Sequence, residues 1–260
     1  MLRDMARNFA RDEIGPHVEE DEKNHFWRPE IFEKMAALGF FGFCIEEQYG
    51  GNGMGFTEGV LAIQEVSKVH TSWRMAFNMQ CWGPAWTIQT FGTGEQKRHY
   101  IPKFVSGEYV GSFAMTEADV GSDVAAMKCY AEDRGDHFVL NGSKMWITNG
   151  TVCDHGLLYV KTDRNAGTKG ISCLIMDYSL PGISRKKIHD KVGLWASDTA
   201  EITFEDVRVP KELVLGGLNR GFQICMTQLN HTRLGCAAGA LGLSAACLEA
   251  SVKYANERFQ

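Results

Sequence analysis

Two short segments in the middle of the chain gather the side chains best suited to bind a ligand. Residues 113–123 read FAMTEADVGSD, an apolar, strand-like start that breaks into a loop of hydroxyls, carboxylates and glycine. Residues 144–150 read KMWITNG and add a flat indole, a hydroxyl and more backbone donors. Gly121 lets the backbone approach a ligand closely, because glycine has no Cβ. Donors arranged in this way can hold a large, planar molecule that is rich in hydrogen-bond acceptors.

An oxidised flavin is a molecule of this kind. Its ring oxygens and N5 need donors, and the same donors stabilise the negative charge that develops on reduction. Taken singly, Thr116 reads as a strand-end hydroxyl and Trp146 as a core residue. The pairing of the two segments instead favours a flavin contact for both residues.

These two segments resemble the flavin-binding strands of the acyl-CoA dehydrogenases. Four further segments resemble the same family in the same order along the chain, namely residues 46–51, 91–108, 204–210 and 253–260. The likeness covers nearly the whole sequence. One such motif is weak evidence, whereas a set in register is specific.

The resemblance implies FAD as the cofactor and indicates which residues contact it. The expected FAD contacts are Phe113, Met115, Thr116, Gly121, Ser122, Trp146, Ile147 and Thr148. The expected acyl-CoA contacts are Ser122, Ser197, Asn230, His231, Thr232 and Arg233. Asn230 departs from the Asp that is frequent in the family, which leaves its contact on the adenine side open.

The implied reaction is α,β-dehydrogenation of an acyl-CoA thioester. A carboxylate removes the α-proton while the β-hydride moves to flavin N5. Most of the family place this Glu in the final helices, and a minority place it where this chain has Thr232. We therefore expect no catalytic base in residues 1–260, which are expected to be inactive alone. Glu249 and Glu257 are expected to be solvated.

Other functions remain open on the same residues. A catalytically silent flavin- or acyl-CoA-binding module would use the long final helix to dock on a partner. An acyl-CoA reductase or oxidase would have the same fold, because the direction of the reaction depends on the reduction potential of the flavin and on the access of oxygen to it. Residues 229–234 and 246–258 look closest to dehydrogenases of anaerobic aromatic degradation, which act on glutaryl-CoA without decarboxylation or on cyclic carboxyl-CoA thioesters. Residues 78–84 are expected to line the acyl pocket.

Composition excludes several classes of protein. The net charge of −5, with both signs interspersed, predicts no nucleic-acid partner. No apolar run reaches the length of a membrane span, and the N-terminus lacks a signal-peptide core. Eight cysteines without a CxxC pair indicate reduced thiols, and the histidines show no metal-ligand spacing.

The resemblance implies a homotetramer, an electron-transfer flavoprotein as electron acceptor, and a cytoplasmic location, or the mitochondrial matrix in a eukaryote.

The order of elements predicts an α+β fold. We expect a helical domain over residues 1–110, with a capping box at Thr93-Gly-Glu-Gln96. An antiparallel β-barrel or sandwich is expected over 111–215, with strands at 157–160, 171–176 and 200–204 and a two-residue hairpin at Asn141-Gly142. Residues 216–260 are expected to form the first helix of a C-terminal helical domain, a helix of roughly forty residues. Because that helix is apolar on most sides, we expect it to be buried among other helices and the chain to be cut inside this domain.

Overall fold

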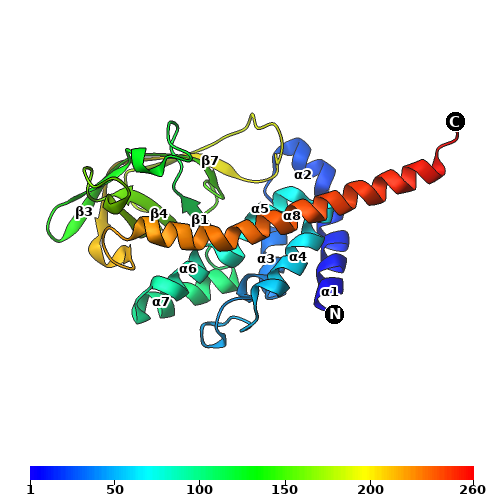
Figure 1. The fold of residues 1–260 in the computed structure, drawn as a ribbon, viewed down its shortest axis with the longest axis horizontal. Coiled ribbons are helices and arrows are strands. Elements are labelled where there is room, and N and C mark those ends of the chain that lie inside the picture. The colour runs from blue at the N-terminus through cyan, green and yellow to red at the C-terminus, as the bar shows by residue number, and fades with distance from the viewer.

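Seven α-helices precede the first strand in a computed structural model that describes all of residues 1–260 (Figure 1). Pro29 opens the third of them, at a position where its missing N–H removes no helical hydrogen bond. The predicted helical N-terminal part without strands is confirmed. The helices are α1 (Leu2–Phe9), α2 (Val18–Asn24), α3 (Pro29–Ala37), α4 (Phe56–Val69), α5 (Thr71–Trp82), α6 (Pro84–Phe91) and α7 (Gly94–Ser106).

The capping box at the start of α7 is confirmed. Gln96 N donates to Thr93 Oγ1 at 3.2 Å, and Thr93 N donates to Gln96 Oε1 at 3.0 Å. Gln96 Nε2 also donates to the carbonyls of Glu212 and Val214. One side chain therefore caps the helix and ties it to the segment that leaves the sheet.

Eight strands follow the helices and form one sheet. They are β1 (Gly111–Ala114), β2 (Tyr130–Asp133), β3 (His137–Thr148), β4 (His155–Lys161), β5 (Ile171–Asp177), β6 (Ile183–Lys187), β7 (Thr199–Pro210) and β8 (Val214–Leu215). Their order is β6-β7-β3-β2-β4-β5-β8, with β1 beside β4. The three predicted strands lie within β4, β5 and β7, and the α+β class is confirmed.

The sequence analysis predicted an antiparallel barrel or sandwich, but the sheet also contains parallel strand pairs. β1 runs parallel to β4, β2 makes a parallel contact with β4, and the outermost strands β6 and β8 do not pair with each other. Side chains outside the strand fix the entry of β1, because Gly111 N donates to Gln80 Oε1 at 2.8 Å and Asn149 Nδ2 donates to Gly111 O at 3.0 Å.

The hairpin predicted at Asn141-Gly142 is wrong. β3 runs straight through both residues, and its register against β7 shifts there. Asn141 pairs across the shift, where its Nδ2 donates to Asp206 Oδ1 and its Oδ1 accepts from Asp206 N, both at 2.9 Å. Gly142 has φ +132°, and a Cβ there would lie 2.7 Å from Cys129 Cα. The Asn-Gly pair therefore serves a bulge and a close backbone contact, and the turn lies earlier, at residues 134–136.

The final helix, α8 (Gly221–Glu257), is a single helix of 37 residues, close to the predicted length. Glycines on one face let it lie against α4 and α5. Leu234, Leu241 and Leu248 lie exposed elsewhere on the helix, so the predicted burial is found on one face only. α8 is also long and apolar enough to cross a membrane by length and composition, a test that the core helix of a globular protein passes as well.

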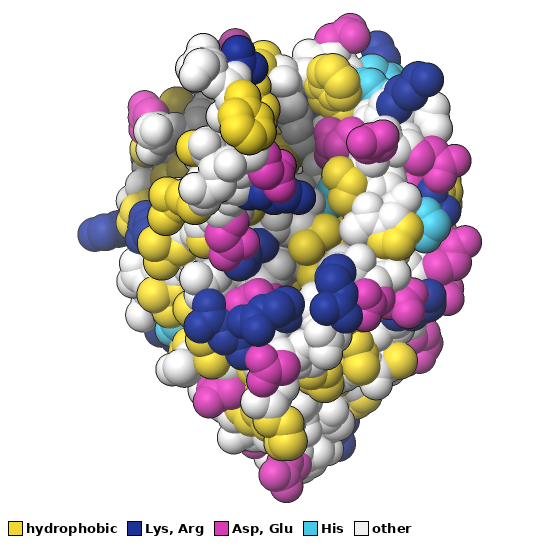
Figure 2. Space-filling view, turned by 90° about the vertical axis from the view of Figure 1, so that its right-hand side faces the viewer, with side chains coloured by type: hydrophobic (Ala, Val, Ile, Leu, Met, Phe, Trp, Pro, Cys, Tyr) yellow, Lys and Arg dark blue, Asp and Glu magenta, His cyan; other side chains and the backbone are white.

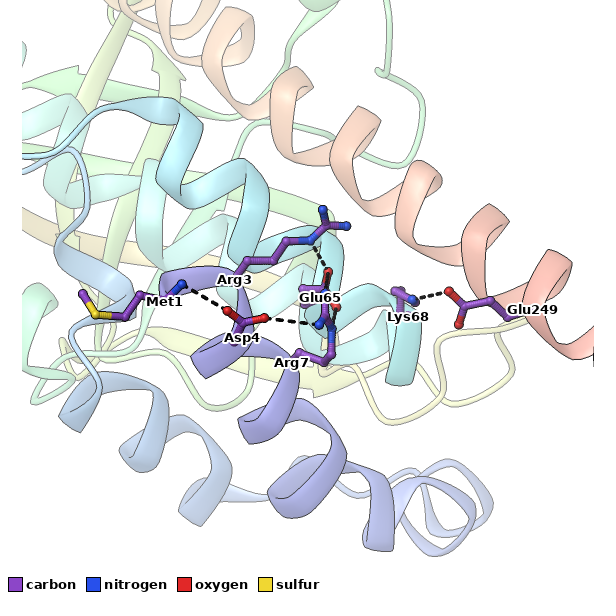
Figure 3. Close-up of polar contacts among 7 residues, drawn as sticks. All are labelled: Met1, Arg3, Asp4, Arg7, Glu65, Lys68 and Glu249. Atoms are coloured by element: carbon purple, nitrogen blue, oxygen red, sulfur yellow. Dashed lines mark hydrogen bonds and ion pairs between the residues drawn. The ribbon is translucent and has the colours of Figure 1, made fainter.

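Ion pairs hold α4 to both ends of the chain (Figure 3). Glu65 of α4 is only 1% exposed and accepts from Arg3 Nε at 2.6 Å and Arg7 Nε at 3.1 Å. Burial opposes ionisation of Glu65, but these arginine hydrogen bonds outweigh it and lower the pKa of the carboxyl. Lys68, near the end of α4, donates to Glu249 of α8 at 2.5 Å. Glu249, expected to be solvated, is thus largely exposed but paired.

The end of the molecule from which α8 projects carries basic and acidic side chains side by side (Figure 2). Among the N-terminal helical segments, surface pairs include Lys34 with Glu13 and Arg11 with Asp12. Opposite charges are therefore interspersed on this face.

Replacing Gly142 with Ala should lower the free energy of unfolding by about 2–4 kcal/mol, since backbone strain and overpacking add. Gly135→Ala is the matched control, because Gly135 also has a positive φ (+92°) but an added Cβ there meets no atom within 4 Å. The control should lose about 1 kcal/mol, from strain alone. Urea denaturation of both variants measures the difference, and equal losses would contradict the close approach of Gly142 to Cys129.

Candidate flavin and acyl-CoA site

A cleft of about 560 Å³ lies between the loop that follows β1 and the first turns of α8. Six of the predicted site residues line it, from segments more than a hundred residues apart: Phe113, Met115, Thr116, Gly121, Ser122 and Arg233. A larger hollow of about 870 Å³, between α7 and residues 211–218, contains none of them. We place the site in the smaller cleft, because the predicted donors meet there.

The chain leaves β1 directly into the wall of this cleft. β1 pairs with β4 so that Phe113 lies opposite Leu157, and the Phe113 ring packs 5.1 Å from Tyr159. Thr116 O accepts from Met145 N at 2.8 Å, which holds the segment next to β3. The hydroxyls of Thr116 and Ser122 make no hydrogen bond within the chain and lie at the cleft, so they are available to a ligand.

Trp146 is not a core residue. Its side chain is 56% exposed, and its backbone has φ +63°, the left-handed region that a bulky residue rarely adopts. β3 bulges against β7 between Lys144 and Ile147, and this irregularity turns the indole out of the sheet. An exposed indole on strained backbone is typical of a ligand-binding wall.

The two residues after Trp146 are placed differently. Ile147 is buried in the core of the sheet domain, so only its backbone remains for a contact with FAD. Thr148 is half-buried opposite Thr199, and its hydroxyl makes no hydrogen bond within the chain. These three residues are absent from the walls of the cleft itself, so the structure does not bring them together with the β1 segment in one hollow.

Residues 230–233 lie in the first half of α8, and their side chains have surroundings that differ from one another. Arg233 lines the cleft, and its NH1 donates to Asn230 Oδ1 at 2.7 Å. His231 instead lies between Phe56 and Trp86, at ring distances of 4.6 and 4.0 Å. Thr232 O accepts from Asn78 Nδ2 at 3.5 Å, which joins α8 to α5. Only Arg233 of the four contributes to the cleft wall.

Ser197 lies away from the cleft, in the connection between β6 and β7. This connection docks on α2, where Glu22 accepts from Trp195 N at 2.9 Å and Ala196 N at 3.2 Å. Ser197 is buried there, and Lys191 Nζ donates to its carbonyl. The structure therefore does not place Ser197 beside Ser122 in the cleft.

The carboxylates near the cleft are either locked or exposed. Glu117 accepts from Lys144 Nζ, Cys129 N and Lys128 N, which leaves it no free role as a base. Asp123 lines the cleft but is exposed to solvent.

A polar seam, which sequence reasoning largely missed, runs from this region between α8 and its neighbours. It consists of side chains packed against glycines 235, 239 and 242 of α8, namely Ser67, Arg74, Asn78 and Trp82. Each carries a buried polar atom without a partner: Ser67 Oγ, Arg74 Nε, Asn78 Oδ1 and Trp82 Nε1. Spacing could have indicated it, since residues 74, 78 and 82 recur every four positions on α5.

The cleft wall on α8 was also missed in part. Phe222, Met226 and Leu229 line the cleft with Arg233, at the three- and four-residue spacing of one helix face. Thr168 adds a hydroxyl from the turn before β5. The apolar stripe on α8 was visible in the sequence, but the contact of Thr168 depends on tertiary structure.

Comparisons with known proteins cover nearly the whole chain. Family models described as the acyl-CoA dehydrogenase N-terminal, middle and C-terminal domains match residues 1–108, 112–207 and 219–260. A glutaryl-CoA dehydrogenase of Desulfococcus multivorans is 43% identical over all of this chain and 68% of its own length.

Two solved structures are similar throughout the chain. A glutaryl-CoA dehydrogenase in complex with glutaryl-CoA has a TM-score of 0.97 and 42% identity, and the chain covers 67% of it. A glutaryl-CoA dehydrogenase of Mycobacterium smegmatis with FADH2 has a TM-score of 0.93 and 30% identity, with 65% covered. The chain thus spans about two thirds of the length of these relatives. With matches to all three of its domain models in order, the chain belongs to the acyl-CoA dehydrogenase family.

Proposed function

We propose that the protein is an FAD-dependent dehydrogenase that introduces an α,β double bond into an acyl-CoA thioester. The observation that carries this proposal is a cleft lined by the unpaired hydroxyls of Thr116 and Ser122, joined by the Met145–Thr116 backbone hydrogen bond to the strand on which the strained Trp146 is exposed. The family membership of the chain supports the same chemistry. If FAD titration of the colourless apoprotein gives no binding, the proposal is wrong.

The residues of the chain fit FAD as an acceptor-rich, planar group. Thr116 and Thr148 would donate hydroxyl hydrogen bonds, and Trp146 would cover the ring system. Bound FAD supplies the hydride acceptor. Arg233 would offer its guanidinium to the thioester side of the cleft, and Phe222, Met226 and Leu229 would exclude water from it. We assign no base among residues 1–260, since Glu117 is locked and Asp123 is solvated.

For the substrate we propose an acyl-CoA with a polar end, and glutaryl-CoA in particular. Arg74 carries a buried, unpartnered Nε, and its NH1 donates to Cys236 Sγ at 3.8 Å. Cys236 lies one turn of α8 beyond Arg233, which lines the cleft. A guanidinium at this position could bind a carboxylate in the bidentate manner. Two similar glutaryl-CoA dehydrogenases support this choice.

For the whole protein we propose a homotetramer that passes electrons to an electron-transfer flavoprotein, in the cytoplasm or the mitochondrial matrix. The exposed leucines of α8 support the oligomer, because an apolar face of this size favours association. Sedimentation at micromolar concentration tests it, and a monomer would contradict it.

Replacing Trp146 with Ala should weaken FAD binding with little loss of stability. A side chain exposed by more than half supplies less than about 1 kcal/mol of fold stability. Trp82→Ala is the matched control, because Trp82 is fully buried in the helical core and should cost about 3–5 kcal/mol. FAD titration and thermal unfolding are measured for both variants. A Trp146→Ala protein that keeps its FAD affinity would refute the flavin-wall assignment.

Replacing Arg74 with Gln should lower kcat/KM for glutaryl-CoA by about thirtyfold or more, because an unpaired substrate carboxylate would be left desolvated. The value for butyryl-CoA, which has no distal charge, should change much less. Lys68→Gln serves as the control, since it removes another cation, one whose ion pair with Glu249 of α8 lies at the surface. The assay uses protein expressed from the complete open reading frame. Equal losses for the two substrates would argue against the carboxylate site.

A further inference from the structure

A buried ion pair adjoins the segment of Met115 and Thr116 in the proposed flavin site. Lys144 is 0% exposed and Glu117 is 7% exposed, and Lys144 Nζ donates to Glu117 Oε1 at 2.9 Å. Burial lowers the pKa of Lys144, which makes a close negative partner necessary if the amine is to remain charged.

The contacts of this pair join the two segments that were assigned to the flavin. Lys144 Nζ also donates to Met115 O at 2.9 Å. Lys144 and Trp146 both belong to the bulged stretch of β3. Met145, which lies between them, donates its N–H to Thr116 O. The amine therefore fixes the backbone on one side of the cleft to the strand that presents the indole.

Glu117 secures a third segment to the same point. Its carboxylate accepts from Lys128 N at 2.7 Å and from Cys129 N at 3.0 Å. Its own N–H donates to Val120 O at 2.9 Å, which closes the turn before Gly121 and Ser122. The loop that carries those two cleft residues is thus anchored at both ends.

Stability alone is a weak explanation for such a pair. Taking two charges out of water costs several kcal/mol per ion, and an apolar pair of similar volume is often neutral or more stable. What an apolar pair cannot supply is a set of directed hydrogen bonds to Met115, Lys128 and Cys129. The pair is therefore better explained by a demand for geometry.

We propose that the Lys144–Glu117 pair is a positioning device that sets the separation between the segment of Met115 and Thr116 and the indole of Trp146, and so the fit of the flavin ring. This inference rests on the proposed FAD site. Both residues act through others and need not touch the cofactor.

The test compares Glu117→Gln and Lys144→Met with Glu65→Gln in protein expressed from the complete open reading frame. Glu65→Gln is the matched control, because it also neutralises a buried, arginine-paired carboxylate, but between α1 and α4 (Figure 3). Each apoprotein is titrated with FAD, and the visible flavin spectrum and the thermal unfolding temperature are recorded. The double variant Lys144→Met with Glu117→Leu is included because it removes both charges at once.

We expect the two single variants to bind FAD about ten- to a hundredfold more weakly, as when a group that orients a ligand is removed. Their bound flavin should show a shifted spectrum. The control should lose thermal stability but keep the wild-type affinity and spectrum. The double variant should regain stability without regaining affinity.

Wild-type affinity and spectrum in Glu117→Gln and in the double variant would overturn the inference and leave the proposed function intact. A loss of affinity in the control equal to that in Glu117→Gln would also overturn it, since any destabilisation would then suffice. Wild-type protein that binds no FAD would overturn both proposals. If Lys144→Met does not fold, the double variant and Glu117→Gln still decide the question.

Discussion

The site depends on two close contacts of β3, one with Cys129 and the other with Glu117 and Met115. At Gly142 its backbone comes so near Cys129 that a Cβ would have no room. Two residues later its side chain, Lys144, turns inward to bind Glu117 and the carbonyl of Met115. The register of β3 against β7 shifts on either side of this stretch, between Leu140 and Gly142 and between Lys144 and Ile147, and Trp146 lies exposed within the second shift. The same strand thus combines packing constraints inside the sheet with an exposed aromatic surface.

α8 shows the same relation between a packing constraint and a site. Its glycines at 235, 239 and 242 bring the helix close to α4 and α5, where ordinary side chains would collide with Asn78, Arg74 and Ser67. The turns before these glycines carry Phe222, Met226, Leu229 and Arg233 to the cleft. A substitution that pushed α8 outward would therefore disturb both the helix packing and the cleft wall.

Local chemistry explains which parts of this structure could be predicted from the sequence. The capping box at Thr93 and the extended runs of β4 and β5 depend on residues near one another in the chain, and each was found. Asn141-Gly142 fails because the same dipeptide suits a tight turn and a bulge, and only the approach of Cys129 decides between them. The exposure of Trp146 could be anticipated from the family resemblance alone, since a Trp in a strand otherwise favours the core.

The four-residue spacing of the polar seam on α5 is visible in the sequence, but the unpaired state of its polar atoms could not be predicted, for a related reason. Arg74 and Asn78 appear in the sequence as ordinary polar residues of a helix, and their loss of hydrogen-bond partners arises only when the glycine face of α8 covers them. Each unpaired buried group costs about 1–3 kcal/mol. Arg74 Nε is a donor that the carboxylate of the proposed substrate would satisfy, whereas Asn78 Oδ1 is an acceptor and needs a donor such as water, so the helix contact leaves groups of both kinds unpaired.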